Sequence, residues 1–279
     1  MPRYVTLAFI VAVGVGSWWL WNDSQLLDKV KDYVENGEIR TLEARYTADQ
    51  IMAQNRNELL GNGNRTFQEP SLKFYPYLLL EAKYTRSDKK TAEGILLWGL
   101  VDGEMVLDTE TWEKTHGFED AINANATATD FKVLNALAKY NGTLTRDQLQ
   151  RELNLELDTL DRWIDSARSK HLITQKGNEI SLHFEKPRIL VLPETKIKQW
   201  LVTKSDDQAQ RIPKKYSKAQ VEKVAKAAFG NDFTIRNTSE VFLPVYSIQV
   251  LNQDGSLLTS YWNALNGQRI QSKFLVPTP

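Results

Sequence analysis

The side chains that most often carry catalysis are sparse in this sequence. There is no cysteine, which excludes thiolate nucleophiles, zinc–thiolate sites and disulfides. The histidines are His116, His171 and His183, and no two of them have the spacing of a metal-binding pair such as His-x-x-x-His. Without cysteine, and with scattered histidines, a nucleophile–base pair has little support. We therefore predict neither a metal site nor a cofactor.

Two other patterns resemble functional motifs. The run Gly61-Asn62-Gly63-Asn64 lacks the lysine and the strand–loop–helix setting of a phosphate-binding loop. Asp108 and Glu110 could form an acid–base pair, which is what a carboxylate-dependent hydrolase would need. Charged turns commonly have the same composition, so we predict that the chain is not an enzyme and keep the hydrolase as a third hypothesis.

The elements that must carry any function begin with an apolar segment. Val5 to Trp21 holds no charged residue, and residues 1–22 are just long enough to cross a hydrocarbon core of about 30 Å. Trp18, Trp19 and Trp21 cluster at one end, where aromatic rings favour the interface between membrane and water. We predict an uncleaved signal-anchor helix that contacts membrane lipid, with a cleaved signal peptide as the alternative.

Residues 23–38 continue with apolar positions at helical spacing, which predicts an amphipathic stalk that could also mediate homo-oligomerisation. Lysine and arginine do not clearly favour either side of the apolar segment, so their distribution leaves the orientation open. A very short tail before a first membrane helix is commonly kept inside the cell. We expect the body to lie outside the cytoplasm, in a bacterial periplasm or at the cell exterior.

The rest of the sequence contains an internal duplication. Each copy has a tyrosine before a capped helix, then a strand with a proline, then a strand with a tryptophan and an Asp-Gly or Asn-Gly turn. The matched positions are Tyr46 and Tyr216, Pro76 and Pro244, Trp98 and Trp262, and Gly103 and Gly267. We interpret all eight as structural positions, and we expect each proline at a sheet edge, a bulge or a strand start.

Each copy predicts an α+β unit in which one helix lies on a small antiparallel sheet. The first unit covers residues 39–118 and the second residues 194–273, which leaves a tail at 274–279. The second unit, through Tyr246–Val250 and Trp262–Gln268, resembles PepSY-type domains of bacterial exported and membrane proteins. That resemblance implies a small binding or regulatory module without catalytic residues of its own.

The segment between the copies, residues 127–187, differs from both. Helical periodicity predicts helices at 130–140, 146–153 and 157–171, and a two-stranded hairpin follows around Lys176-Gly177-Asn178. Three helices and a hairpin indicate a winged-helix-like domain. The third helix of such a domain lies in the major groove of DNA, with its N-terminal residues near the bases. Here that end carries Glu156, Asp158 and Asp161. Because DNA binding depends on cations that neutralise phosphates, we expect no nucleic-acid partner.

Taken together, these patterns predict an α+β protein with an N-terminal transmembrane helix, two similar units and a winged-helix-like domain between them. The function that they favour is a membrane-anchored scaffold or regulatory component that binds other envelope proteins. The main alternative is a membrane-tethered winged-helix transcription regulator whose body lies in the cytoplasm.

Overall fold

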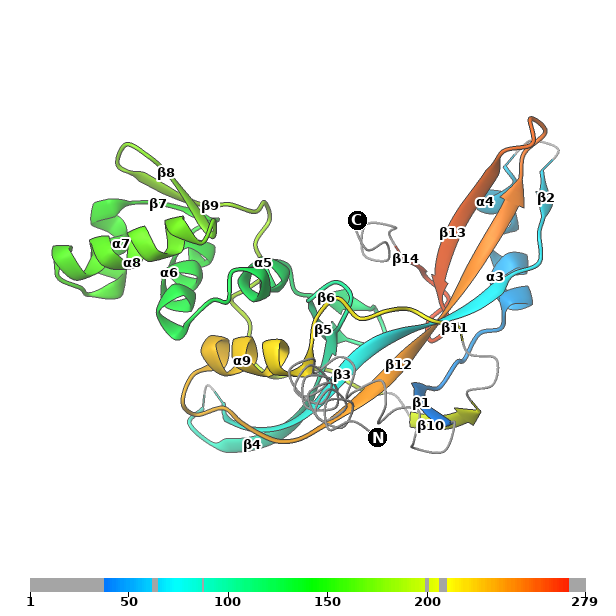
Figure 1. The fold of residues 1–279 in the computed structure, drawn as a ribbon, viewed down its shortest axis with the longest axis horizontal. Helices are drawn as coiled ribbons and strands as arrows, with labels where there is room; N and C mark the ends of the chain where they lie inside the picture. Colours follow the sequence, from blue (N-terminus) through cyan, green and yellow to red (C-terminus); the bar gives the residue numbers. More distant parts are fainter. Residues whose placement is uncertain (1–37, 62–64, 87, 199–200, 206–209, 271–279) are drawn as a thin grey trace, which may run out of the picture. The chain divides into compact units, whose positions relative to one another are not determined.

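The computed structural model describes residues 38–61, 65–86, 88–198, 201–205 and 210–270. The chain divides into two units, and the smaller one holds residues 1–39 and 203–208. The account below concerns the larger unit, Arg40–Val202 and Ala209–Pro279. In the described residues, seven helices accompany a curled sheet, so the fold class is α+β (Figure 1).

Two long strands form the centre of the sheet. β3 (Ser71–Thr85) and β12 (Thr234–Leu251) pair antiparallel, and each turns back into a hairpin with the next strand, β4 (Thr91–Gly99) or β13 (Leu257–Asn263). The other strands are β1 (Glu38–Leu42), β2 (Thr66–Phe67), β5 (Met105–Asp108), β6 (Glu113–Lys114), β10 (Leu201–Ser205), β11 (Gln210–Arg211) and β14 (Arg269–Ile270). The two copies therefore share one sheet.

The register of the two central strands is symmetrical. Pro76 lies opposite Phe242, and Phe74 lies opposite Pro244, so the pairing reads the same from either strand. The hairpins repeat this agreement, because Trp98 and Trp262 occupy the same place relative to the prolines. A local two-fold relation thus connects the two copies.

Both prolines lie inside a long strand, which differs from the edge, bulge or strand start expected from the sequence. The reason is a change of neighbour. β3 pairs with β11 before Pro76 and with β4 after it, while β12 pairs with β1 before Pro244 and with β13 after it. The missing N–H falls at the gap between two neighbours, so no ladder bond is lost. The carbonyls of Pro76 and Pro244 accept hydrogen bonds from the N–H groups of Leu100 and Ala264.

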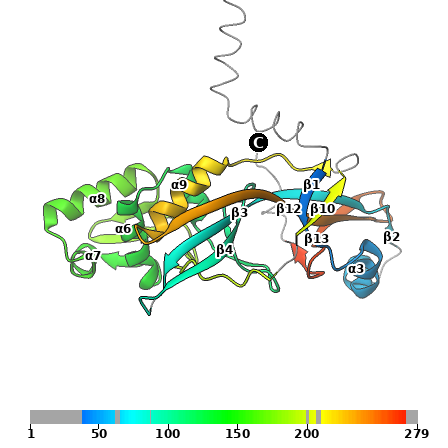
Figure 2. The ribbon, with the colours of Figure 1, turned by 90° about the horizontal axis from the view of Figure 1, so that it is seen from below.

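The helices of the two copies are exchanged. α3 (Ala48–Gln54) and α4 (Arg56–Leu60) belong to the first copy, but Ile51 and Leu59 pack in one apolar cluster with Trp262 of the second. α9 (Lys218–Phe229) belongs to the second copy, but Val221 and Val224 share a cluster with Trp98 of the first. Figure 2 shows α3 beside β13 and α9 over the β3–β4 part of the sheet.

The exchange is fixed by the residues that precede each helix. The backbone N–H groups of Arg45 and Tyr46 donate to the carbonyl of Ala264 at 2.8 and 2.9 Å, and those of Lys215 and Tyr216 donate to Leu100 at 2.8 and 2.9 Å. Thr47 and Ser217 then begin the helices with capping boxes, as the sequence indicates. Each helix therefore begins at the turn of the opposite copy.

The segment between the copies folds as three helices and a small sheet. The helices are α6 (Ala128–Lys139), α7 (Arg146–Leu153) and α8 (Leu157–Ser169), and the strands are β7 (Thr143–Thr145), β8 (Ile173–Lys176) and β9 (Glu179–Leu182) in the order β7-β9-β8. A short helix, α5 (Phe118–Asn123), leads into this segment. The Phe118 ring contacts Trp98 and Phe131 at centroid distances of 4.9 and 5.7 Å, so one apolar core joins the sheet to the three helices.

Among the described residues, no helix is both long enough and apolar enough to cross a membrane. The anchor predicted at residues 1–22, with Trp18, Trp19 and Trp21, lies outside the described residues, as do nearly all of the stalk at 23–38 and the whole tail at 274–279.

Candidate functional site

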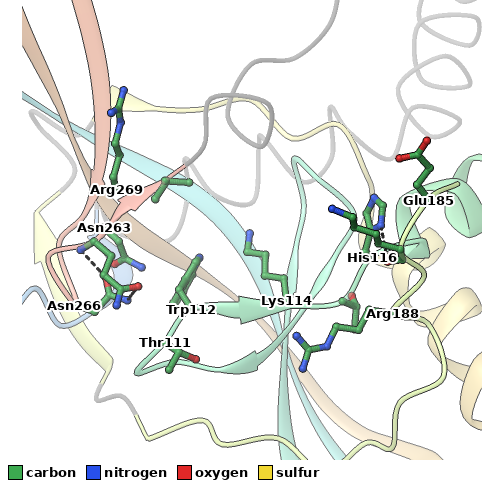
Figure 3. A pocket seen from close by; sticks show the side chains of 13 residues that line it. Thr111, Trp112, Lys114, His116, Glu185, Arg188, Asn263, Asn266 and Arg269 are labelled. Carbon is green, nitrogen blue, oxygen red and sulfur yellow. Dashed lines mark hydrogen bonds between the residues drawn. The ribbon is translucent and has the colours of Figure 1, made fainter. Parts of the chain in front are cut away.

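A polar cleft of about 530 Å³ lies where three distant segments meet (Figure 3). The first segment is β6 with the residues on either side of it, the second is the connection at 185–188, and the third is the turn from β13 into β14. The lining residues are Thr111, Trp112, Lys114, Thr115, His116, Glu185, Lys186, Arg188, Asn263, Asn266, Gln268, Arg269 and Ile270. Figure 3 shows Asn263, Asn266 and Arg269 on one side, with His116, Glu185 and Arg188 on the other.

The turn from β13 into β14 is held by its own amide side chains. The Oδ1 atom of Asn263 accepts from the N–H of Leu265 at 2.9 Å, and that of Asn266 accepts from Gln268 at 3.0 Å. Gly267 has a φ of +70°, which a glycine adopts without strain. Local hydrogen bonding thus explains why Asn-Gly occupies this turn.

Among the described residues that line the cleft, Asn263 is the one polar residue with no exposed surface. Its side chain is 0% exposed, and its Nδ2 atom has no hydrogen-bond partner among the described residues. Because its Oδ1 atom already accepts from Leu265, the orientation of the amide is determined and the free atom is the donor. An unsatisfied buried donor costs about 1–3 kcal/mol, so it favours an acceptor brought by a ligand.

Lys114 lines the cleft and is paired with the buried carboxylate of Asp102. Its ammonium donates to Asp102 at 2.5 Å and to the hydroxyl of Tyr77 at 2.7 Å, and it also lies 5.9 Å from the ring centre of Trp112. Burial opposes the charge, but Asp102 and Tyr77 outweigh it and raise the pKa of Lys114. The lysine therefore stays protonated and cannot act as a base near neutral pH.

Two arginines at the rim hold exposed carboxylates. Arg269 pairs with Glu58 of α4 at 2.9 Å, and both side chains are half exposed. Arg188 pairs with Glu113, and these side chains are also close to half exposed. Exposed ion pairs contribute about 0–1 kcal/mol, so another carboxylate can replace Glu58 or Glu113 as the partner of its arginine at little cost.

The three histidines differ in their surroundings. In the described residues there is no cluster of three or more potential metal ligands. The Nδ1 atom of His116 lies 3.2 Å from the carbonyl of Lys186, and its ring meets Phe184 edge-on. His116 thus ties the connection at 185–188 to the sheet. His171 lies just after α8, and His183 just after β9, and neither lines the cleft.

The carboxylate of Asp108 takes part in a local turn. Asp108 accepts from the backbone N–H groups of Glu110 and Thr111 at 2.7 and 3.3 Å, which closes a turn. The Glu110 N–H is the main reason why the pKa of Asp108 is lowered. A catalytic acid near neutral pH needs the opposite shift.

None of the eight matched positions is among the described residues that line the cleft, and each of the two turn glycines packs against the matched tyrosine of the other copy. The Cβ that Gly103 lacks would come within 3.0 Å of the Tyr216 ring, and at Gly267 it would come within 3.2 Å of Tyr46. Trp98 and Trp262 are buried, and their indole N–H groups donate to the carbonyl of Gly103 and the hydroxyl of Ser260.

Sequence reasoning named His116 and the stretch Trp262–Gln268, but it did not predict that residues of either would line a cleft. Asn263 is the clearest case, because its place in the alignment of the two copies is taken in the first copy by Gly99. The sequence offered one signal: Asn263 is a polar residue at the end of an apolar strand, and the other copy has a glycine at the aligned position. Nothing in the sequence indicated that the connection at 185–188 approaches this turn.

Comparisons of the chain with protein-family models, with curated proteins and with solved structures returned no match.

Proposed function

We propose that this protein is a non-catalytic scaffold or regulatory component of an envelope assembly, which binds another protein through its body. In this proposal residues 1–22 anchor it in the membrane, and the body lies outside the cytoplasm. The absence of charge over Val5 to Trp21 supports the anchor.

The observation that carries the binding role is the polar cleft. Its lining combines an aromatic side chain, Trp112, with the buried donor of Asn263 and the rim arginines Arg188 and Arg269. Convergent polar groups in a cleft of this size are typical of a binding site. Its side chains offer hydrogen bonds and charge to a ligand. The raised pKa of Lys114 keeps this residue protonated, so it does not act as a base near neutral pH.

We further propose that the two copies arose by duplication and that residues 127–187 form a winged-helix-like domain. The symmetrical register of β3 and β12 supports the first point, and the order of α6, α7, α8 and the β8–β9 hairpin supports the second. The likeness to PepSY-type domains stays a prediction.

DNA binding by this domain is the main competing function, and the three helices with their hairpin favour it. The charges of α8 weigh against it. The helix begins after Glu156 with Asp158 in its first turn. Arg168 is paired with Asp165 at 2.6 Å, and Asp161 is paired with Arg146 at 2.6 Å. An acidic N-terminal end would repel phosphates.

The membrane topology separates these two functions. A reporter fused after Pro279 should be active when the reporter requires export and silent when it requires the cytoplasm. Activity only in the cytoplasm would overturn the extracytoplasmic assignment. Retention of the full chain on DNA, lost as salt increases, would then favour the transcription regulator.

A crosslinking experiment in intact membranes tests the binding role. A photo-reactive residue placed at exposed Thr111, on the cleft rim, should capture a protein partner. The matched control is exposed Lys223 on α9, which does not line the cleft. Equal capture from both positions, or no protein captured from Thr111, would contradict partner binding at the cleft.

A further inference from the structure

The turns of the two copies differ in charge at equivalent positions. The alignment sets Gly99, Asp102, Glu104 and Met105 of the first copy against Asn263, Asn266, Gln268 and Arg269 of the second. The glycine and the two acidic residues of the first turn thus each correspond to an amide residue in the second turn. The buried methionine of the first turn corresponds to an arginine. The first turn carries two carboxylates, and the second carries none.

Both carboxylates of the first turn satisfy nearby donors. Asp102 binds the ammonium of Lys114 at 2.5 Å. Glu104 is buried and accepts from the hydroxyl of Thr115 at 2.6 Å and from the backbone N–H groups of Gly117 and Glu119 at 2.9 and 3.2 Å. In this copy the chain itself supplies the acidic groups that its donors require.

In the first copy a carboxylate occupies the space that corresponds to the Asn263 side chain. A Cβ at Gly99 would lie 1.9 Å from the Oδ1 atom of Asp102, so that space already holds an acidic oxygen. In the second copy the side chain of Asn263 takes the equivalent position and leaves its Nδ2 atom without a partner among the described residues. The second turn therefore presents a donor where the first holds an acceptor.

The wider lining of the cleft also has more basic than acidic residues. Among the described residues, those that line the cleft with a positive charge are Lys114, Lys186, Arg188 and Arg269, and the one acidic residue is Glu185. Lys114 is neutralised by Asp102, but the carboxylates that pair with Arg188 and Arg269 belong to half-exposed side chains. Arginine has five N–H donors, so each retains donors for a second carboxylate.

We propose that the cleft binds an acidic segment of the partner protein, with a carboxylate of that segment placed between Asn263 and the rim arginines. This proposal rests on the proposed function and specifies its ligand. The segment brings from outside the acidic groups that the first copy carries in Asp102 and Glu104. A cleft of about 530 Å³ is large enough for more than one carboxylate, which favours a peptide segment over a small anion.

The test uses the purified full chain in detergent and two fluorescent peptides of equal length. One is rich in aspartate and glutamate, and the other carries asparagine and glutamine at the same places. We expect the acidic peptide to bind at least about tenfold more tightly, since a hydrogen bond to a charged group is stronger than a neutral one. Equal binding of the two peptides would overturn the proposal.

Three variants locate the site. Arg269→Gln and Arg188→Gln should each weaken binding of the acidic peptide by roughly tenfold, the loss expected for one charge-assisted contact. Asn263→Gly copies the first turn and should weaken it as well. The matched control is Arg236→Gln, which removes an arginine of β12 that pairs with Glu93 outside the cleft. Equal loss in the control would mean that nonspecific charge carries the binding.

Two further outcomes separate the proposals. Free glutarate that competes as strongly as the acidic peptide would identify a small-anion site and overturn the peptide proposal. A partner captured at Thr111 together with equal binding of both peptides would leave the proposed function standing while the acidic specificity fails. Selective binding of the acidic peptide without any captured partner would support the acidic specificity while the proposed function fails. If Asn263→Gly does not fold, the two arginine variants still decide the result.

Discussion

At the scale of single residues, two glycines lie at the contacts between the copies. Gly103 and Gly267 have φ values of +69° and +70°, and each faces a tyrosine from the opposite copy. Tyr216 also donates its hydroxyl to Glu119 or Asn123, both at 3.1 Å, so the contact is polar as well as aromatic. A side chain at either glycine would meet both the backbone strain and the ring.

We expect Gly103→Ala to be more destabilising than Gly267→Ala. Both place a Cβ at a positive φ, which costs about 1–2 kcal/mol. At Gly103 the new atom would also lie 3.0 Å from the Cα of Glu119, a backbone atom, whereas at Gly267 it would meet only the Tyr46 ring at 3.2 Å. Urea unfolding gives the free energies. Gly255→Ala is the control, because its φ is +81° and nothing lies within 4 Å. A control effect equal to that of Gly103→Ala would contradict the packing argument.

The buried pair of Lys114 and Asp102 should be strongly coupled. The side chains are 12% and 7% exposed, so removal of one charge leaves the other buried without its partner. We expect Lys114→Met and Asp102→Asn each to lower the free energy of unfolding by about 3–5 kcal/mol. The double variant should lose less than the sum of the two, in a double-mutant cycle. Additive losses would show that the pair does not interact as the geometry indicates.

At the scale of elements, the long strands depend on where their neighbours change. Pro76 and Pro244 are buried, and each stands at the gap between two successive partners of its strand. The usual rule that proline weakens a strand interior fails here because no ladder bond is available at that point.

Replacement of either proline by alanine should therefore destabilise the protein. Pro76→Ala and Pro244→Ala introduce a buried N–H without a ladder partner, which costs about 1–3 kcal/mol, and they add freedom to the unfolded chain. The two losses should be similar, because the positions are equivalent. Thermal unfolding measures both, and a gain in stability at either position would refute the account of the gap.

The helices of the central segment are clamped by an ion pair that makes them sensitive to acid. Asp130 in the first turn of α6 binds Lys170 at 2.5 Å, just after α8. Burial opposes its ionisation, but the hydrogen bonds from Lys170 and Thr127 outweigh burial and lower the pKa of Asp130. A lowered pKa contributes stability above the ordinary aspartate value and loses it as the pH falls through the folded value.

Asp130→Asn should therefore flatten the acid side of the stability curve. We expect the variant to be less stable than the natural chain at pH 7, with the difference shrinking as the pH falls below about 4. Urea unfolding at a series of pH values, monitored by the helical circular dichroism signal, measures this. A difference that stays constant down to pH 2 would show that the Asp130 charge does not contribute.

At the scale of the whole molecule, the exchange of helices makes the two copies interdependent. α9 covers the Trp98 hairpin and α3–α4 cover the Trp262 hairpin, while β3 and β12 share one sheet. Neither copy can bury its own tryptophan hairpin without a helix from the other. The cleft follows from this arrangement, since the turn of the second copy meets β6 of the first copy and the connection at 185–188.

A cut between the copies should leave the pieces together. A protease site inserted after Leu192, which is 53% exposed, should be cleaved in the folded protein. The two fragments should still co-elute in size-exclusion chromatography and unfold in a single transition, because the sheet and both clusters span the cut. Separation of the fragments without denaturant would indicate independent units.

The sequence alone determined the local features. The hydroxyl groups of Thr47, Thr145 and Ser217 indicate helix N-caps, and the structure confirms these three helix starts and adds a capping box at each. The α+β class and the order of the elements follow from periodicity and turn residues in the same way. The small number of histidines and the lack of cysteine are properties of the sequence itself. The anchor and the topology lie outside the described residues and stay predictions.

Tertiary structure decided everything that depends on residues far apart in the chain. The sequence placed Pro76 at a sheet edge, a bulge or a strand start because it could not show that β11 and β4 meet the strand on either side of it. It assigned each helix to the nearest sheet because the bonds from Tyr46 to Ala264 and from Tyr216 to Leu100 span more than a hundred residues. The cleft is hidden for the same reason. Local patterns record short-range hydrogen bonding, whereas the pairing of copies and the burial of Asn263 depend on contacts that only the folded chain brings together.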